Sequence, residues 1–243
     1  MSLRTAFDTP DRKRAHNRAL FATIADRYDL ITRLLSFGQD ARWKRTLIAR
    51  AELQPGERVL DLACGTGDLA FAAAARGGRV IGLDLTHRML QLASRKSAAA
   101  AFLTGDMTHL PFAPHAFDVV TTGYGLRNVP DLTAAIDEIA RVLRPGGRLL
   151  SLDFNRPESA PIRAAYLAYL TIVGGALGWL LHRDPDTYRY IPGSIRRYPG
   201  AAGVAALLTS RGFTGVIVVP LLFGLMTLHL AERPANVGPR LSR

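Results

Sequence analysis

Residues 59–70 read VLDLACGTGDLA, and this stretch decides the fold of the 243-residue chain. Val59, Leu60 and Leu62 form a short apolar run, glycines 65 and 67 follow it, and helix-forming residues continue from Asp68. This order predicts a strand, a tight turn and a helix, an arrangement that lets backbone N–H groups approach an anionic ligand. The spacing also fits the dinucleotide fingerprint, and the same glycines can serve as a plain connection between strand and helix.

Two acidic residues favour a nucleotide-like ligand at this turn. Asp61 lies at the end of the first predicted strand, and Asp84 ends the next apolar run, residues 80–83. An acid at the end of the second strand can accept hydrogen bonds from both hydroxyls of a ribose. We therefore expect Asp61, Asp84 and the adjacent Leu85 to lie beside the ligand.

Strands and helices alternate through most of the chain. We predict strands at residues 58–63, 79–85, 101–104, 117–122 and 148–154, and helices at 67–76, 88–96 and 132–143. This alternation predicts an α/β fold, with a mostly parallel sheet and helices on both faces. Two strands, 214–219 and 225–232, follow a helix at 204–211. The link between them is too short for a crossover, so the last strand should run antiparallel to its neighbour.

Two helical regions lie outside this alternation. Residues 1–15 are expected to be frayed, while 17–35 and 41–53 have helical spacing, so residues 1–54 should form an N-terminal lid on a main domain of residues 55–243. Residues 164–181 carry no charge over 18 residues, which is long enough to suggest a membrane span. A span would separate the last two strands from their sheet. We therefore predict a buried, lid or membrane-surface helix within a helical insertion at about 157–200.

Composition limits the class of protein. An apolar content of 48% with 21% charged residues is typical of a globular protein. The net charge of +11 fits either a solvated basic surface or a patch that attracts anionic lipid or nucleic acid. The single cysteine, Cys64, excludes an internal disulfide and suits the cytoplasm, and the charged N-terminus lacks the apolar core of a secretion signal. The six histidines and the cysteine show no metal-ligand spacing, so no metal is predicted.

Further motifs fall where the carboxyl ends of the predicted strands meet, and others lie near both ends of the chain. They are Gly105-Asp106-Met107, Gly123-Tyr124-Gly125-Leu126-Arg127-Asn128-Val129, Arg144-Pro145-Gly146-Gly147, the N-terminal FATIADRYD (21–29) and WKR (43–45), and the C-terminal YRYI (188–191) and SIRRYP (194–199). Together they resemble the class I S-adenosylmethionine-dependent methyltransferases. More narrowly, residues 21–232 resemble the menaquinone/ubiquinone C-methyltransferase family. The chain departs from the family pattern at Gly123, Gly193 and residues 153–155, where Ser, Glu and Glu-Phe-Ser are common.

The resemblance implies a Rossmann-like class I methyltransferase fold with a seven-stranded sheet and S-adenosyl-L-methionine as the cofactor. Thr66 and the flanking glycines would hold the methionine moiety, whose carboxylate favours the helix N-terminus. Asp84 would bind the ribose, Asp106 would accept from the adenine amine, and Met107 would contact the ring. The implied cofactor-binding residues are Asp61, Gly65, Thr66, Gly67, Asp84, Leu85, Asp106, Met107 and Gly123.

The resemblance also implies C-methylation of a prenylated quinol, most simply demethylmenaquinol to menaquinol as the last step of menaquinone biosynthesis. Arg127, Asn128 and the nearby Asp84 would be the catalytic residues. A guanidinium keeps its proton, so Arg127 would stabilise the phenolate while a water molecule carries the proton away and Asn128 orients it. The residues expected to line the quinol pocket are Tyr28, Tyr124, Tyr188, Tyr190, Arg196 and His229.

Other functions remain open on the sequence alone. The acceptor could be a benzoquinol of ubiquinone biosynthesis or another phenol or lipid, and a non-catalytic cofactor-binding partner is a further alternative. A nucleic-acid methyltransferase is disfavoured, because Gly123-Tyr124-Gly125 stands where base-amine methylases carry an Asn/Asp-Pro-Pro-aromatic turn. The expected partners are the quinol and, transiently, a membrane surface, with no nucleic acid and a possible homodimer. The expected location is the cytoplasm, with peripheral contact at the inner face of its membrane.

Overall fold

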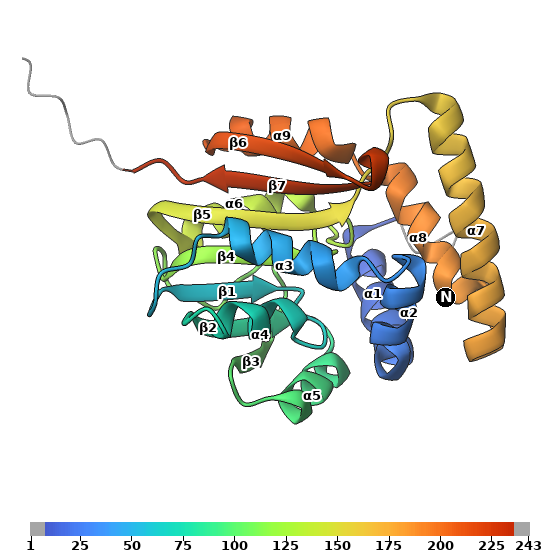
Figure 1. The fold of residues 1–243 in the computed structure, drawn as a ribbon, viewed down its shortest axis with the longest axis horizontal. Helices are drawn as coiled ribbons and strands as arrows, with labels where there is room; N and C mark the ends of the chain where they lie inside the picture. Colours follow the sequence, from blue (N-terminus) through green and yellow to red (C-terminus); the bar gives the residue numbers. More distant parts are fainter. Residues whose placement is uncertain (1–7, 236–243) are drawn as a thin grey trace, which may run out of the picture.

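A seven-stranded sheet forms the centre of the computed structural model, which describes residues 8–235 (Figure 1). The strand order is β3-β2-β1-β4-β5-β7-β6; β1 to β5 run parallel, and β7 is antiparallel to both β5 and β6. The predicted fold class and the antiparallel last strand are confirmed. The strands are β1 (Arg58–Leu62), β2 (Arg79–Asp84), β3 (Ala101–Thr104), β4 (Phe117–Gly123), β5 (Leu143–Phe154), β6 (Thr214–Leu221) and β7 (Met226–Glu232).

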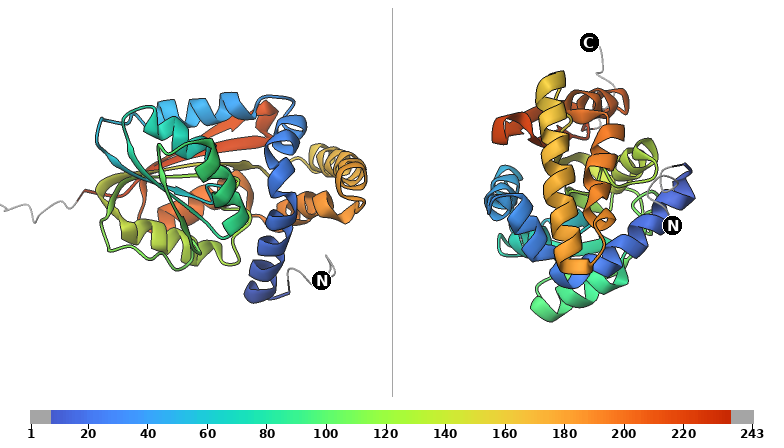
Figure 2. Two further views of the ribbon diagram at one scale, coloured as in Figure 1. Left: turned by 90° about the horizontal axis from the view of Figure 1, so that it is seen from below. Right: turned by 90° about the vertical axis from the view of Figure 1, so that its right-hand side faces the viewer.

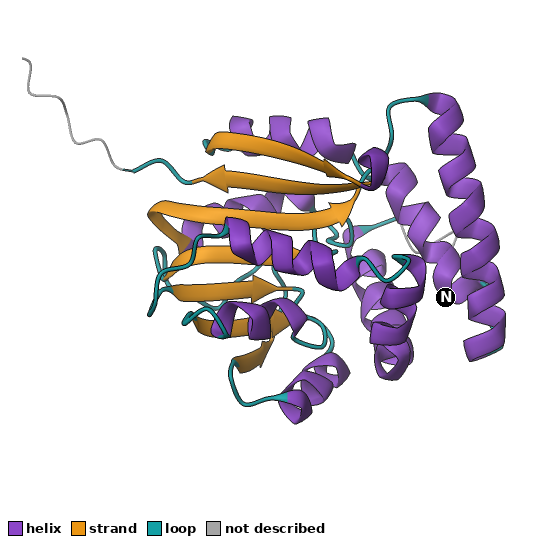
Figure 3. Ribbon diagram, viewed as in Figure 1, coloured by secondary structure: helices purple, strands orange, loops and turns teal. Residues whose placement is uncertain are grey.

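Helices cover both faces of the sheet, as expected (Figure 3). Alternation along β1 explains why: Val59 packs with α3 (Asp40–Arg50) and α4 (Asp68–Ala74), while Leu60 and Leu62 pack on the opposite face with α6 (Leu132–Val142) and α9 (Gly200–Ser210). The helix α5 (His87–Lys96) lies near β2 and β3. Both faces of β1 are therefore buried, and the carboxyl side chain of Asp61 lies inside the protein with no exposed surface.

The helices α1 (Pro10–Ile24) and α2 (Tyr28–Leu35) lie across the carboxyl ends of the parallel strands, joined by the short 3-10 helix η1 (Ala25–Arg27) (Figures 1 and 2). The expectation of frayed residues is wrong for residues 10–15, which are helical. Thr9 caps α1 by accepting a hydrogen bond from the Arg12 N–H, and Pro10 begins the helix. The rest of the expected frayed segment, residues 1–7, lies outside the described residues. Of the helices in the predicted N-terminal lid, α3 instead packs on the sheet face.

The helices α7 (Ala160–His182) and α8 (Asp186–Arg197) form a hairpin beyond α1 and α2 (Figure 2). The glycines of α7 permit this close packing, because a Cβ at Gly178 would lie 2.5 Å from the Asp184 carbonyl oxygen and one at Gly174 would lie 3.3 Å from Tyr188. Both helices lie within the predicted helical insertion at about 157–200, although Pro192 interrupts the helical pattern of α8. Here packing against α7 outweighs local propensity.

Among the described residues, α7 is the one helix that is long and apolar enough to cross a membrane by length and composition. The position of α7 between two paired strands agrees with the prediction that it does not span a membrane. β5 precedes α7 and pairs directly with β7, which follows it. The chain thus returns from α7 to the same sheet that it left.

The buried face of α6 offers a test of the core. Ile136 is fully buried between α6 and the sheet, so Ile136→Ala should lower the free energy of unfolding by about 2–5 kcal/mol. Ile172 on α7 is 71% exposed, and Ile172→Ala should change that free energy by less than about 0.5 kcal/mol. Urea denaturation of the three proteins measures both values. Equal losses in the two variants would contradict this placement of the core.

Candidate active site

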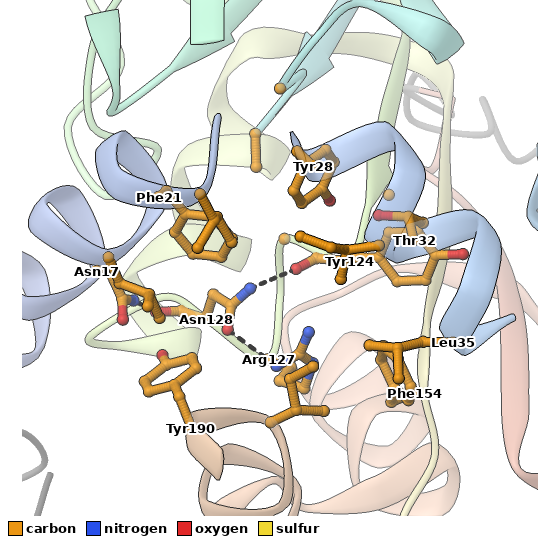
Figure 4. A pocket seen from close by; sticks show the side chains of 18 of the residues that line it. Asn17, Phe21, Tyr28, Thr32, Leu35, Tyr124, Arg127, Asn128, Phe154 and Tyr190 are labelled. Atoms are coloured by element: carbon orange, nitrogen blue, oxygen red, sulfur yellow. Dashed lines mark hydrogen bonds between the residues drawn. The ribbon is translucent and has the colours of Figure 1, made fainter. Parts of the chain in front are cut away.

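A cavity of about 530 Å³ opens at the carboxyl ends of the parallel strands, where the sequence predicted the ligand crevice. The ends of β1, β2 and β4 form one side of it, and α1, α2, α7 and α8 enclose the rest (Figure 4). A smaller recess of about 20 Å³ adjoins the cavity and shares five of its lining residues: Tyr28, Ala63, Gly65, Gly123 and Tyr124.

The turns at this edge adopt unusual backbone conformations. Gly65 and Gly67 have φ of 54° and 90°, which glycine reaches without steric cost. Ala63 and Tyr124, at the ends of β1 and β4, also have positive φ, 51° and 61°, although they carry a Cβ. Such strain persists only where the surrounding structure enforces it, and it is concentrated at functional sites. At this edge the two strained residues bring the β1 and β4 turns to the cavity wall.

The carboxylate of Asp84 connects two of these turns. Its Oδ2 accepts a hydrogen bond from the Gly65 N–H at 2.9 Å, and its Oδ1 accepts one from the Thr86 N–H at 2.8 Å. Burial raises the pKa of Asp84, although both hydrogen bonds oppose the rise. A carboxylate oxygen can accept more than one hydrogen bond, and Asp84 lines the cavity. Two vicinal hydroxyls of a ribose fit this pattern of acceptors.

Asp61 is fully buried, and one of its two oxygens is unsatisfied. Its Oδ1 accepts from the Thr121 hydroxyl at 2.8 Å, whereas Oδ2 has no hydrogen-bond partner among the described residues. Burial raises the pKa of Asp61 to about 7. Since Asp61 lines the recess, a hydrogen-bond donor on a ligand there would satisfy an atom that the protein leaves unpaired. This orphaned oxygen fits the amino group of a methionine moiety.

Residues of α1 and α2 contact the groups expected to bind the cofactor. The Thr66 hydroxyl donates to Asp29 at 2.6 Å, and Arg14 donates from Nε to Asp106 Oδ2 at 2.6 Å. Burial raises the pKa of Asp106, but hydrogen bonds from Thr108 and Arg14 outweigh this effect and hold the pKa below its usual range. The helices over the cavity are thus bonded to both ends of the predicted cofactor site.

Arg127 is 6% exposed and forms an ion pair inside the protein. Its Nε donates to Asp153 Oδ1 at 3.2 Å, and its guanidinium carbon lies 4.8 Å from the centre of the Phe154 ring. Nη1 donates to Ser194 Oγ at 2.7 Å and to Asn128 Oδ1 at 3.1 Å. Among residues 8–235, Nη2 has no partner, so it can bind an oxygen in the cavity that Arg127 lines.

The loop that carries Arg127 is fixed by further hydrogen bonds. Asn128 donates from Nδ2 to the Tyr124 carbonyl oxygen at 2.8 Å (Figure 4). From α1, Lys13 donates to the Arg127 carbonyl oxygen at 3.3 Å, and Asn17 donates to that of Asn128. Burial and the nearby Arg127 lower the pKa of Lys13 to about 8. The side-chain oxygen and nitrogen of Asn128 both have protein partners, which fixes its orientation at the cavity wall.

The structure brings most of the predicted site residues to one place. Three of them line neither the cavity nor the recess: Gly67 is the N-cap of α4, Arg196 is exposed on α8, and His229 is buried in β7. His229 packs in the core, where its Nε2 bonds the Ala201 carbonyl oxygen at 3.0 Å. The predicted residues that do line them are Tyr28, Asp61, Gly65, Thr66, Asp84, Leu85, Asp106, Met107, Gly123, Tyr124, Arg127, Asn128, Tyr188 and Tyr190. Within the described chain, no three His, Cys, Asp or Glu side chains are grouped to hold a metal ion.

Sequence reasoning did not assign roles to several residues at the site. Asp29 and Lys44 lie within the FATIADRYD and WKR motifs, and Asp153 stands at a departure from the family pattern, so the motifs could have indicated them. Ser194 opens the SIRRYP motif, which could likewise have indicated it, whereas Arg14 had no comparable signal. Arg14 lies in the segment expected to be frayed, and Ser194 reaches Arg127 only because α8 folds back over the loop.

The parallel sheet with its antiparallel last strand, the glycine turn, and the acids after β1, β2 and β3 define a class I S-adenosylmethionine-dependent methyltransferase. Similar folds include a possible histamine N-methyltransferase of Thermotoga maritima (TM-score 0.66, 18% identity, 89% of this chain and 99% of that one). Another is the phosphoethanolamine N-methyltransferase 2 of Haemonchus contortus, solved with S-adenosyl-L-methionine (TM-score 0.59, 17% identity, 79% and 52%).

Within this class, the chain belongs to the ubiE/COQ5 methyltransferase family, which it matches over residues 10–233. The demethylmenaquinone methyltransferase of Beutenbergia cavernae is 41% identical over 92% of this chain and 93% of its own length. That of Thermus thermophilus is also 41% identical, over 88% of this chain and 100% of its own length. The chain is therefore an enzyme, a methyltransferase that uses S-adenosyl-L-methionine.

The raised pKa of Asp61 predicts a pH dependence of stability. Between the usual carboxyl pKa of about 4 and its folded value of about 7, the native state binds more protons than the unfolded state. The free energy of unfolding should therefore fall as pH rises through this window. As pH rises, the free energy of unfolding of the wild type should fall by up to about 1.4 kcal/mol per pH unit relative to that of Asp61→Asn. Urea denaturation at a series of pH values measures this difference. Parallel pH profiles of the two proteins would contradict a neutral Asp61.

Proposed function

We propose that the enzyme transfers the methyl group of S-adenosylmethionine to a ring carbon of a prenylated naphthoquinol, converting demethylmenaquinol to menaquinol. The cavity supports this proposal, because one end has the turn and acids that fit the cofactor and the other end is aromatic and apolar. Phe21, Tyr28, Tyr124 and Phe154 surround the space beside Arg127 (Figure 4). A flat hydroquinone ring fits such surroundings. The relatives' names favour a naphthoquinol over a benzoquinol of ubiquinone biosynthesis.

The buried Arg127–Asp153 pair is the observation that carries the proposal. The bound cofactor supplies an electrophilic methyl group, and a quinol carbon becomes nucleophilic when a phenolic proton leaves. A guanidinium held in a cavity of low polarity stabilises the resulting oxyanion far more than it would in water. Asp153 fixes the guanidinium through Nε, while Nη2 stays available for the oxyanion. Asn128 holds Nη1 from the other side.

Methyl transfer with purified components tests the function. The protein, S-adenosylmethionine and a chemically reduced short-chain demethylmenaquinone should yield the ring-methylated product, identified by mass spectrometry. A demethylated benzoquinol of the same tail length should react at least about tenfold more slowly. Faster methylation of the benzoquinol would assign the enzyme to ubiquinone biosynthesis instead. The absence of product from either quinol, despite cofactor binding, would favour another acceptor or a non-catalytic role.

Arg127→Lys tests the electrostatic role. Lysine keeps the charge opposite Asp153 but cannot bind Asp153, Ser194 and an oxyanion through a planar fork. We expect kcat to fall by about 100-fold while the dissociation constant of S-adenosylmethionine changes little. Arg211→Lys alters a partly exposed arginine that pairs with Asp137, and it should keep full activity. Loss of cofactor binding in Arg127→Lys would contradict the assignment.

We further propose that the cavity mouth meets the membrane that holds the substrate. Phe37 and Ile162 line the cavity and are 64% and 53% exposed, so they mark where a prenyl tail can leave it. Farther along α7, Ile172, Trp179 and Leu180 are 60–71% exposed. An exposed apolar surface next to arginine side chains, such as Arg183, suits an anionic lipid surface. A cytoplasmic enzyme with peripheral membrane contact follows from this proposal.

The exposed α7 side chains can be tested with vesicles. The double variant Ile172→Asp/Trp179→Asp should bind vesicles of phosphatidylglycerol and phosphatidylcholine at least about tenfold more weakly than the wild type, because it removes two large apolar groups from the contact. Ile217→Asp, at a position on β6 that is 53% exposed, should bind like the wild type. Flotation at low salt measures both. Unchanged flotation of the double variant would exclude α7 as the membrane contact.

A further inference from the structure

The small recess beside the cavity contains a charged side chain to which no role has been given. Lys44, on α3, lines the recess together with Asp61, Thr66 and Asp68. The recess adjoins the large cavity, with which it shares five lining residues, so it can receive the polar end of a ligand that lies mainly in the cavity. It lies where the ends of β1 and β4 meet, on the far side of the glycine turn from Asp106 at the end of β3.

Lys44 is held in place by two acids. Its Nζ lies 2.7 Å from Asp40 Oδ2 and 2.9 Å from Asp68 Oδ2, and its side chain is 10% exposed. Tyr124 donates its hydroxyl proton to the other oxygen of Asp40, and its ring centre lies 5.8 Å from Nζ. Burial opposes the charge of Lys44, but Asp40 and Asp68 outweigh it and raise the pKa. The ammonium is therefore positively charged and fixed in position.

The ammonium has a hydrogen-bond donor to spare. A lysine carries three N–H donors, and the described residues accept from Lys44 at two positions, Asp40 and Asp68. Across the recess, Asp61 Oδ2 is an acceptor without a donor. The recess thus offers one unused cationic donor and one unused buried acceptor, which complement the two charged groups of a zwitterionic amino acid.

The start of α4 does not supply this cation by itself. The carboxylate was expected to favour that helix N-terminus, but α4 is seven residues long and begins with the acidic Asp68. Asp68 places a negative charge where the positive end of the helix dipole would lie. Lys44 neutralises Asp68 and offers an N–H donor at the same place.

We propose that Lys44 binds the α-carboxylate of the methionine moiety of S-adenosylmethionine, with the α-ammonium at Asp61. The inference rests on the assignment of this cofactor, whose ribose and adenine would extend from the recess along the turn to Asp84 and Asp106. Lys44 would then recognise the cofactor by one chemical group, its carboxylate. Nucleosides that lack this group lose the contact while keeping those to Asp84 and Asp106.

Isothermal titration calorimetry with three ligands tests the proposal. The ligands are S-adenosylmethionine, its decarboxylated form and 5′-methylthioadenosine, which lacks the whole amino-acid group. The wild type should bind S-adenosylmethionine about 10- to 100-fold more tightly than the decarboxylated form, as expected for a charge-assisted hydrogen bond. Equal affinities of the wild type for the two sulfonium ligands would overturn the proposal without any variant. Failure to bind any of the three would instead contradict the cofactor site as a whole.

Variants then assign the effect to Lys44. Lys44→Gln should weaken S-adenosylmethionine by about 10- to 100-fold yet change the affinity for decarboxylated S-adenosylmethionine by less than about threefold. Lys44→Arg should restore most of the lost affinity. Lys96→Gln is the matched control, because Lys96 also approaches Asp68, at 3.6 Å, but does not line the recess. If Lys44→Gln loses affinity equally for both sulfonium ligands, Lys44 has only a structural role as an ion pair. The same conclusion follows if the variant keeps the wild-type affinity for both.

Discussion

The carboxylate of Asp84 is the interaction on which the rest of the site depends. It accepts from the Gly65 N–H in the turn after β1 and from the Thr86 N–H in the turn after β2. One buried side chain therefore sets the spacing of two turns that belong to separate strand–helix units. Burying a carboxylate carries a desolvation cost, which these two N–H groups offset in part. Because both hydrogen bonds come from the protein itself, the turn is organised before a ligand arrives. A ligand that donates hydroxyl groups to the same oxygens adds to this compensation.

The sequence predicted the features that depend on local patterns. Alternating apolar runs gave the strands and helices, and the glycines and acids after β1, β2 and β3 gave the cofactor end of the cavity. The remaining features depend on contacts between distant residues. Arg127 pairs with Asp153, 26 positions away, and Lys13 bonds the loop after β4 across more than a hundred residues. The positive φ of Ala63 and Tyr124 was also unpredictable, because neither residue type favours that conformation.

The helix α8 is a second feature that depends on contacts between distant residues. Its local sequence, with Pro192 and Gly193 in the interior, argues against a helix. The helix exists because glycines of α7 let its backbone approach closely, which then places Ser194 beside Arg127. The segment between β5 and β6 thus contributes a polar contact to the reaction end of the cavity as well as an apolar wall. Arg196 belongs to the SIRRYP motif and His229 to β7, but the fold directs Arg196 to the surface and His229 into the core.

The position of β7 bears on how the chain is made. It is the last strand in the sequence, yet it lies between β5 and β6 in the sheet. During synthesis, β6 leaves the ribosome first and has no partner until β7 follows. Throughout that interval β5 presents an open edge of unpaired amide groups, the kind of surface through which nascent chains associate wrongly. Leu225 and Met226, at the start of β7, also line the cavity. The cavity is therefore completed only after β7 has been synthesised, and a chain that stops before β7 has neither a closed sheet nor a finished binding site.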